Sequence, residues 1–138
     1  MSSRQTRKII PLFTAEAADG VSTALDVSKY DDISLQVSCE ASTSLTLKFQ
    51  ASLSNTAPDF SAAQTASNHW DYVAVYDYQD PSATGQPIPG DTGISFSAVS
   101  VANSCTNYLV NVDNIQWLSA EISSHSAGSV TVNAILAD

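Results

Sequence analysis

Short segments in which apolar and polar residues alternate run through most of this 138-residue chain. Ile33–Cys39 and Leu45–Ala51 alternate strictly, and a period of two places every second side chain on the same face of a β-strand. No segment carries a sustained apolar stripe at helical spacing, and at most Phe60–Gln64 is expected to form one helical turn. The pattern therefore predicts an all-β protein.

About nine short strands are expected, separated by polar, glycine-containing or proline-containing turns. In chain order they are Ile9–Thr14, Thr23–Val27, Ile33–Cys39, Leu45–Ala51, Tyr72–Tyr76, Ile94–Val99, Tyr108–Val112, Trp117–Ile122 and Ser129–Leu136. The polar residues between Cys39 and Leu45 predict a hairpin of the third and fourth strands. This strand pattern favours a two-sheet antiparallel sandwich, either jelly-roll-like or immunoglobulin-like.

The few charges are unevenly distributed. Only 14% of the residues are charged and the net charge is −9, yet three of the five basic residues are Arg4, Arg7 and Lys8. We therefore expect a basic N-terminal arm, residues 1–8, ahead of a single β-sandwich domain, residues 9–138. The arm is either a solvated terminus or, with Ile9 and Ile10, a contact for an acidic partner or another copy of this acidic chain. The acidic body argues against nucleic-acid binding.

Localisation and cysteine use follow from equally simple features. No apolar stretch reaches the length of about 18 residues that a membrane-spanning helix needs. The apolar run Ile9–Phe13 is too short for a signal peptide and contains Pro11. We therefore expect synthesis in the cytoplasm and no membrane partner.

Cys39 and Cys105 are interpreted as small buried strand residues, although a disulfide between them stays possible.

The sequence lacks the motifs of common active sites. His69 and His125 are its only histidines, no serine lies in a G-x-S-x-G motif, and no glycine-rich phosphate loop precedes a helix. Asp77, Asp80 and Asp91 could gather around calcium, but solvated carboxylates are the better interpretation. We therefore expect no enzymatic activity, no metal site and no cofactor.

Aromatic residues give the clearest candidate for a binding surface. Trp70, Tyr72, Tyr76 and Tyr78 share one parity and so are expected on one face of a strand. They either fill the core, as we expect for Trp70 and Trp117, or form a platform for sugars or a partner protein. Two long connections, 54–69 and 80–93, are typical of functional loops. The candidate surface contacts are Trp70, Tyr76, Tyr78, Asp80 and Asp91.

One pattern of strands and turns covers most of the chain from about Lys8 onward. Its segments are Leu47–Ala63, Asn68–Asp77, Gly90–Ile94 and Ser126–Val132. This pattern is similar to that of small virion structural proteins of tailed bacteriophages. It contains strands and turns rather than a catalytic signature.

The resemblance implies a virion structural protein that decorates or cements the capsid surface. Its partners would be the major capsid protein, copies of itself, or both, in a homo-oligomer for which a trimer is favoured. A glycan-binding module of the adsorption apparatus, in a tail or head fibre, is the alternative. A neck or tail structural protein is a third interpretation that the sequence leaves open.

Overall fold

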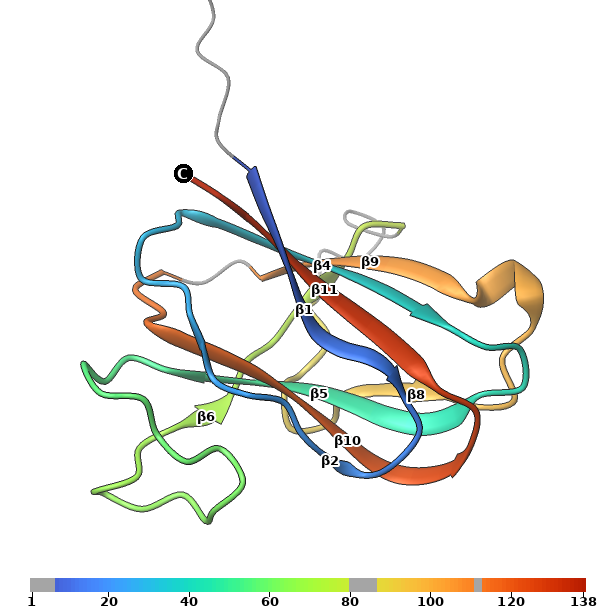
Figure 1. Cartoon of the computed structure of the whole chain (residues 1–138), viewed down its shortest axis with the longest axis horizontal. Coiled ribbons are helices and arrows are strands. Elements are labelled where there is room, and N and C mark those ends of the chain that lie inside the picture. Colours follow the sequence, from blue (N-terminus) through green and yellow to red (C-terminus); the bar gives the residue numbers. More distant parts are fainter. Residues whose placement is uncertain (1–6, 80–86, 111–112) are drawn as a thin grey trace, which may run out of the picture.

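The computed structural model describes residues 7–79, 87–110 and 113–138. Two antiparallel β-sheets pack face to face, as Figure 1 shows. This confirms the predicted all-β sandwich. The described residues form eleven strands and one 3₁₀ turn, Val101–Asn103. Two strands exceed the predicted number, because Gly20–Val21 was not predicted and the segment Tyr72–Tyr76 contributes to two separate strands.

We name the two layers sheet A and sheet B. Sheet A has five strands in the order β1 (Arg7–Glu16), β11 (Val130–Ala137), β4 (Asp32–Cys39), β9 (Cys105–Val110) and β7 (Tyr76–Asp77). Sheet B has the path β2 (Gly20–Val21), β10 (Trp117–Ala127), β5 (Ser44–Ser52) and β6 (Asp71–Tyr72). Two short strands complete sheet B, because β3 (Leu25–Asp26) also pairs with β10 and β8 (Ile94–Phe96) also pairs with β5.

The strand order distinguishes the two sandwich types. If β2 and β3 count as one interrupted strand, and β6 and β8 as another, the chain has eight strand positions. Sheet A then has the order 1-8-3-6, with β7 added at its edge, and sheet B has the order 2-7-4-5. This is the order of a jelly roll, which consists of two Greek keys.

The predicted hairpin of the third and fourth strands is wrong. β4 pairs with β11 and β9 in sheet A, whereas β5 pairs with β10 in sheet B. The chain therefore crosses from one sheet to the other between Cys39 and Ser44. Two amphipathic strands can bury their apolar faces side by side or across the core, and alternation alone does not distinguish these arrangements.

The predicted strand Tyr72–Tyr76 is also wrong. The chain leaves sheet B after Tyr72 and joins sheet A at Tyr76. Val73 and Val75 are both buried in the core on the way. Burial of these two side chains gives a crossing segment the same alternating pattern that a continuous strand would have.

The core lies between the inner faces of the two sheets. Inward-facing residues of β4 and β5, such as Leu35 and Phe49, are almost completely buried, and so are Leu118 in β10 and Val132 in β11. Their outward-facing neighbours are polar in most positions. The predicted alternation thus corresponds to one buried and one outward face per strand.

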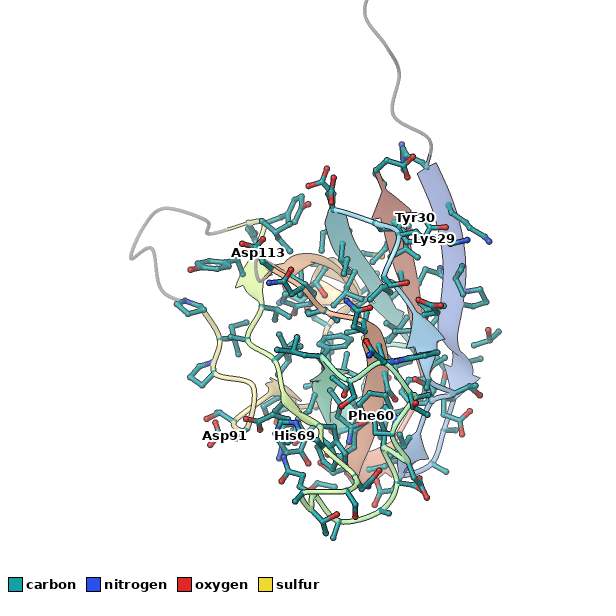
Figure 2. All side chains as sticks on the ribbon, turned by 90° about the vertical axis from the view of Figure 1, so that its left-hand side faces the viewer. Lys29, Tyr30, Phe60, His69, Asp91 and Asp113 are labelled. Atoms are coloured by element: carbon teal, nitrogen blue, oxygen red, sulfur yellow. The ribbon has the colours of Figure 1, made fainter. Side chains whose placement is uncertain are left out.

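The outer faces of the sheets differ in how the chain covers them. Residues 53–70 pack outside sheet B (Figures 1 and 2). There Gln50 donates a hydrogen bond through Nε2 to the carbonyl oxygen of Phe60 at 3.0 Å. This segment contains a hydrogen-bonded turn from Asp59 to Ala62 instead of the expected helical turn. On sheet A, the side chain of Tyr78 lies over the outer face near β9.

Candidate functional site

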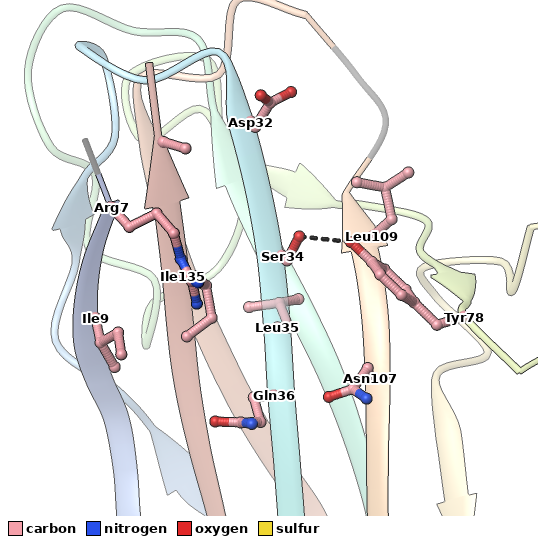
Figure 3. A pocket seen from close by; sticks show the side chains of 11 residues that line it. Arg7, Ile9, Asp32, Ser34, Leu35, Gln36, Tyr78, Asn107, Leu109 and Ile135 are labelled. Atoms are coloured by element: carbon pink, nitrogen blue, oxygen red, sulfur yellow. Dashed lines mark hydrogen bonds between the residues drawn. The ribbon is translucent and has the colours of Figure 1, made fainter. Parts of the chain in front are cut away.

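A groove of about 550 Å³ lies on the outer face of sheet A (Figure 3). We call it the sheet A groove. The described residues that line it are Arg7, Ile9, Asp32, Ser34, Leu35, Gln36, Tyr78, Asn107, Leu109, Ile135 and Ala137. Its volume is within the range of small-ligand sites, about 300–1,000 Å³.

Strand register arranges the outward side chains in rows across the sheet. Ile9 lies opposite Ile135, Ile135 opposite Ser34, and Ser34 opposite Leu109. In a neighbouring row Gln36 lies opposite Asn107. The floor therefore combines an apolar and hydroxyl row with a pair of carboxamides.

Tyr78 forms one wall of the groove and is held at two points. Its backbone N–H donates to the carbonyl oxygen of Asn107 at 3.0 Å. Its hydroxyl is 2.7 Å from Oγ of Ser34, and either oxygen can be the donor. The side chain nevertheless stays 49% exposed, so an ordered aromatic ring is accessible from solvent (Figure 3).

The charged residues of the groove's described lining come from one end of it, although the side chain of Arg7 extends towards Ile135 (Figure 3). Arg7 and Asp32 are the charged members of its described lining, and both lie in the cross-strand row of Ala137. The side chains around Tyr78, namely Ser34, Gln36, Asn107 and Leu109, are all uncharged. This half of the groove therefore offers hydrogen bonds and an aromatic surface without a formal charge.

The outer face of sheet B also has a polar cluster, but its groups bind one another. The Tyr72 hydroxyl donates to Oε1 of Glu121 at 3.0 Å, and the Nζ atom of Lys48 is 5.0 Å from the ring centroid of Tyr72. Burial of the phenol, together with the hydrogen bond and the charge of Glu121, raises the pKa of Tyr72. The sheet A groove is therefore the better candidate for binding an external ligand.

The structure describes four of the five N-terminal residues of the predicted contact surface. Arg4 lies outside the described residues. Arg7 and Lys8 belong to β1, where they pair with Ala137 and Leu136, so the predicted boundary after residue 8 is wrong and the sandwich begins by Arg7. Ile9 is 59% exposed and lines the groove, whereas Ile10 is half-buried against the core.

The predicted role of Trp70 as a surface contact is wrong. Its side chain is 7% exposed, and its ring packs edge-on against Phe60 and Tyr72 at centroid distances of 6.0 and 5.2 Å. Its indole N–H donates to the carbonyl oxygen of Ala62 at 3.1 Å. Trp70 is thus buried, but it lies with Phe60 outside sheet B and not in the sandwich core, where it was expected. Trp117 is instead half-buried and donates to the carbonyl oxygen of Ser54.

The prediction that the four aromatic residues share one face is wrong, because the chain changes sheets between Tyr72 and Tyr76. Tyr76 is half-buried opposite Leu109 in sheet A, next to the groove. Asp91 is exposed in the turn before β8 and does not line the groove, and Asp80 lies outside the described residues. Of the predicted surface contacts, Arg7, Ile9 and Tyr78 meet in the groove.

The remaining candidate groups do not form a second site within the described residues. His69 is exposed, and the Nε2 atom of His125 is 2.7 Å from the carbonyl oxygen of Gly128. No group of three or more His, Cys, Asp or Glu residues in the described part of the chain is arranged to hold a metal ion. The described residues also contain no helix that is long and apolar enough to span a membrane.

The two cysteines are expected to differ in reactivity. Both are free, but Cys39 is half-buried and Cys105 is exposed, which corrects the expectation that both are buried. Burial raises the pKa of the Cys39 thiol, so less reactive thiolate is present at neutral pH. We expect a thiol reagent at pH 7.5 to label Cys105 at least roughly tenfold faster than Cys39.

Peptide mass mapping of a labelling time course measures both rates in one sample. The Cys105→Ser variant isolates the reaction of Cys39, and Cys39→Ser isolates that of Cys105. Equal rates for the two thiols in folded protein would contradict the difference in exposure.

Comparison with known proteins gives one strong structural match. The crystal structure of the SPBc2 prophage-derived protein YomS superposes with a TM-score of 0.63, covering 100% of this chain and 98% of that chain at 15% sequence identity. The two proteins share a fold. No protein-family model matches the chain, and no curated protein matches its sequence.

Sequence reasoning missed Ser34, Gln36 and Asn107 as site residues. Alternation places each on the outward face of its strand, but many other polar residues satisfy the same condition. Only the pairing of β4 with β9 brings these residues into one groove with Tyr78. The signal that defines the site is therefore strand register, which a single sequence does not contain.

Proposed function

We propose that this chain is a structural protein of a tailed-bacteriophage virion, and that it decorates or cements the capsid through protein–protein contacts. The observation that carries this proposal is the full-length fold match to a prophage-derived protein. The jelly roll, a fold that recurs in viral capsid domains, also supports it. In this role the protein needs no enzymatic activity, cofactor, nucleic acid or membrane.

The contact surface in this proposal is the beginning of β1. β1 is an edge strand that pairs with β11, and no other described strand pairs with its free side. Free backbone groups of an edge can bind a neighbouring chain, although Pro11 lacks an N–H and cannot donate to it. Arg7 and Lys8 are exposed there and supply positive charge on an otherwise acidic protein.

The partner that fits this surface is the major capsid protein or a neighbouring copy of the chain. Closed symmetry around a capsid axis favours a ring such as a trimer. We place the protein on the capsid surface after synthesis in the host cytoplasm. A neck or tail position is the second possibility, and imaging of particles distinguishes the two.

Removal of the positive charges at the start of β1 is expected to weaken capsid binding. The Arg7→Ala/Lys8→Ala variant should lower occupancy about five- to tenfold at physiological salt, because charged rim contacts accelerate association. Deletion of residues 1–6 tests the preceding segment without removing any residue of β1. Co-sedimentation with capsids of the phage that encodes the chain measures occupancy.

The matched comparison is Lys8→Ala against Lys29→Ala, since Lys29 is also exposed but lies outside β1. Lys29→Ala should leave occupancy unchanged. Electron microscopy of particles with and without the chain then locates it. A position on the neck or tail would reject capsid decoration, and absence from purified particles would reject the virion role altogether.

A further inference from the structure

We propose that the uncharged half of the sheet A groove binds a short neutral oligosaccharide. In this site the ring of Tyr78 stacks on a sugar face, and the side chains of Gln36 and Asn107 bind its hydroxyl groups. This inference is independent of the proposed virion role, because it rests on the geometry of the groove and on the charge of the chain.

The first support is the preorganisation of Tyr78. The bonds to Asn107 and Ser34 fix the backbone and the far end of the ring, so little conformational freedom is lost when a ligand binds. The ring lies on the outer face of the sheet and is about half exposed. A tyrosine held in this way offers an apolar face for the C–H groups of a sugar ring.

The second support is a pair of carboxamides on the floor of the same groove. Gln36 and Asn107 are exposed, lie opposite each other on β4 and β9, and both line the groove. Within the described part of the chain, their side-chain amides make no hydrogen bond to protein. Each carboxamide provides two donor hydrogens and one acceptor oxygen, which suits hydroxyl groups that both donate and accept.

The third support is electrostatic, and it selects the class of sugar. Among the described residues that line the groove, none beside Tyr78 is charged, and the chain carries a net charge of −9. A sulfated or otherwise anionic glycan would be repelled by the protein and would find no cation beside Tyr78. A neutral glycan needs only the hydrogen bonds and stacking surface that this half provides.

The size of the groove and the carboxamides in its otherwise largely apolar floor favour a small polyol over a protein partner. An ordinary protein interface has an apolar, well-packed centre. In the sheet A groove, the exposed ring instead shares the lining with two amides that form no hydrogen bond within the described residues. Binding of a protein at this face is therefore the competing outcome in the test below.

The test uses the purified full-length chain on an array of neutral hexose and N-acetylhexosamine oligosaccharides, with sulfated and sialylated glycans on the same array. We expect signals from neutral oligosaccharides only. For the strongest neutral binder, titration calorimetry should show at least about a tenfold loss of affinity for Tyr78→Ala, because stacking is removed. Gln36→Ala/Asn107→Ala should cause a comparable loss, and Tyr78→Phe a loss of about two- to threefold.

Leu53→Ala is the matched control, since Leu53 is also exposed but follows β5 in the opposite sheet. Its affinity should equal that of the unmodified chain. The proposal fails if no neutral glycan binds, if anionic glycans bind best, or if Tyr78→Ala binds as well as the unmodified chain. Loss of capsid binding by Tyr78→Ala without any glycan binding would identify a protein interface instead. A negative array leaves the particle assay for the virion role unaffected.

Discussion

Replacement of Gly128 by alanine is expected to lower the free energy of unfolding by about 3 kcal/mol or more. Gly128 has a φ of +76°, a backbone conformation that L-residues with a Cβ rarely adopt. An alanine Cβ would also lie 2.7 Å from Cα and 2.8 Å from Cβ of Thr43, with the Oγ1 atom of Thr43 in the way. The change therefore combines backbone strain with a steric clash.

Thr43 has little room to move away from such a clash. Its side chain is completely buried, its hydroxyl donates to the carbonyl oxygen of Ser129, and its backbone carbonyl accepts a hydrogen bond from Val99. These contacts connect the β4–β5 and β10–β11 crossings at one end of the sandwich. The clash must consequently displace backbone segments, which is costlier than rotation of a flexible side chain.

Chemical denaturation monitored by tryptophan fluorescence measures this effect, and Gly20→Ala is the matched control. A Cβ at Gly20 meets no atom within 4 Å, so its free energy of unfolding should change by less than about 0.5 kcal/mol. Gly128→Ala should unfold at a clearly lower denaturant concentration or fail to fold. Equal midpoints for the two variants would contradict the strained crossing.

Truncation of Trp70 to alanine is expected to cost about 3–5 kcal/mol of stability. The Trp70 indole fills the space between Phe60 and Tyr72 and packs against other residues of the segment 53–70. Its N–H bond to the carbonyl oxygen of Ala62 would also be lost. Gln50 lies under the same segment, completely buried, and its Oε1 atom has no hydrogen-bond partner among the described residues. A cavity beside this amide would admit water and loosen the segment.

Hydrogen exchange measured by mass spectrometry shows where this stability is lost. Trp70→Ala should increase exchange first in residues 53–70, whereas Tyr78→Ala, which truncates an exposed aromatic residue, should cost less than about 1 kcal/mol and leave that segment protected. If Trp70→Ala cost no more than Tyr78→Ala, Trp70 would have to be an exposed surface residue instead.

Strand positions were predictable because burial of one face of a strand requires apolar and polar residues to alternate, and this alternation is visible in the sequence of each strand. The predicted segments Ile33–Cys39 and Leu45–Ala51 agree closely with β4 and β5. Their partners were not predictable, because each strand buries the same kind of face whether its neighbour lies beside it or across the core. The same ambiguity hid the sheet change between Tyr72 and Tyr76, where Val73 and Val75 point into the core.

The candidate site was predictable only in its aromatic component. Tyr78 was identified from its residue type and its position before a long connection. The amides that make its surroundings chemically specific come from β4 and β9, more than 25 residues away along the chain on either side. Their position in the groove depends on the register between β4 and β9, and this register cannot be read from the composition or from the local sequence pattern.

The position of β11 has a consequence for how this protein reaches its native state. β11 lies between β1 and β4 in sheet A, so residues 130–137 must insert between strands that precede them by about a hundred positions. Until they do, β1 has no partner in the sheet and β4 has an open edge. Closure of such long loops makes folding slow, on the order of milliseconds to seconds, and leaves intermediates with exposed strand edges. Sheet A therefore becomes complete only when the last strand docks, and premature truncation would yield aggregation-prone chains.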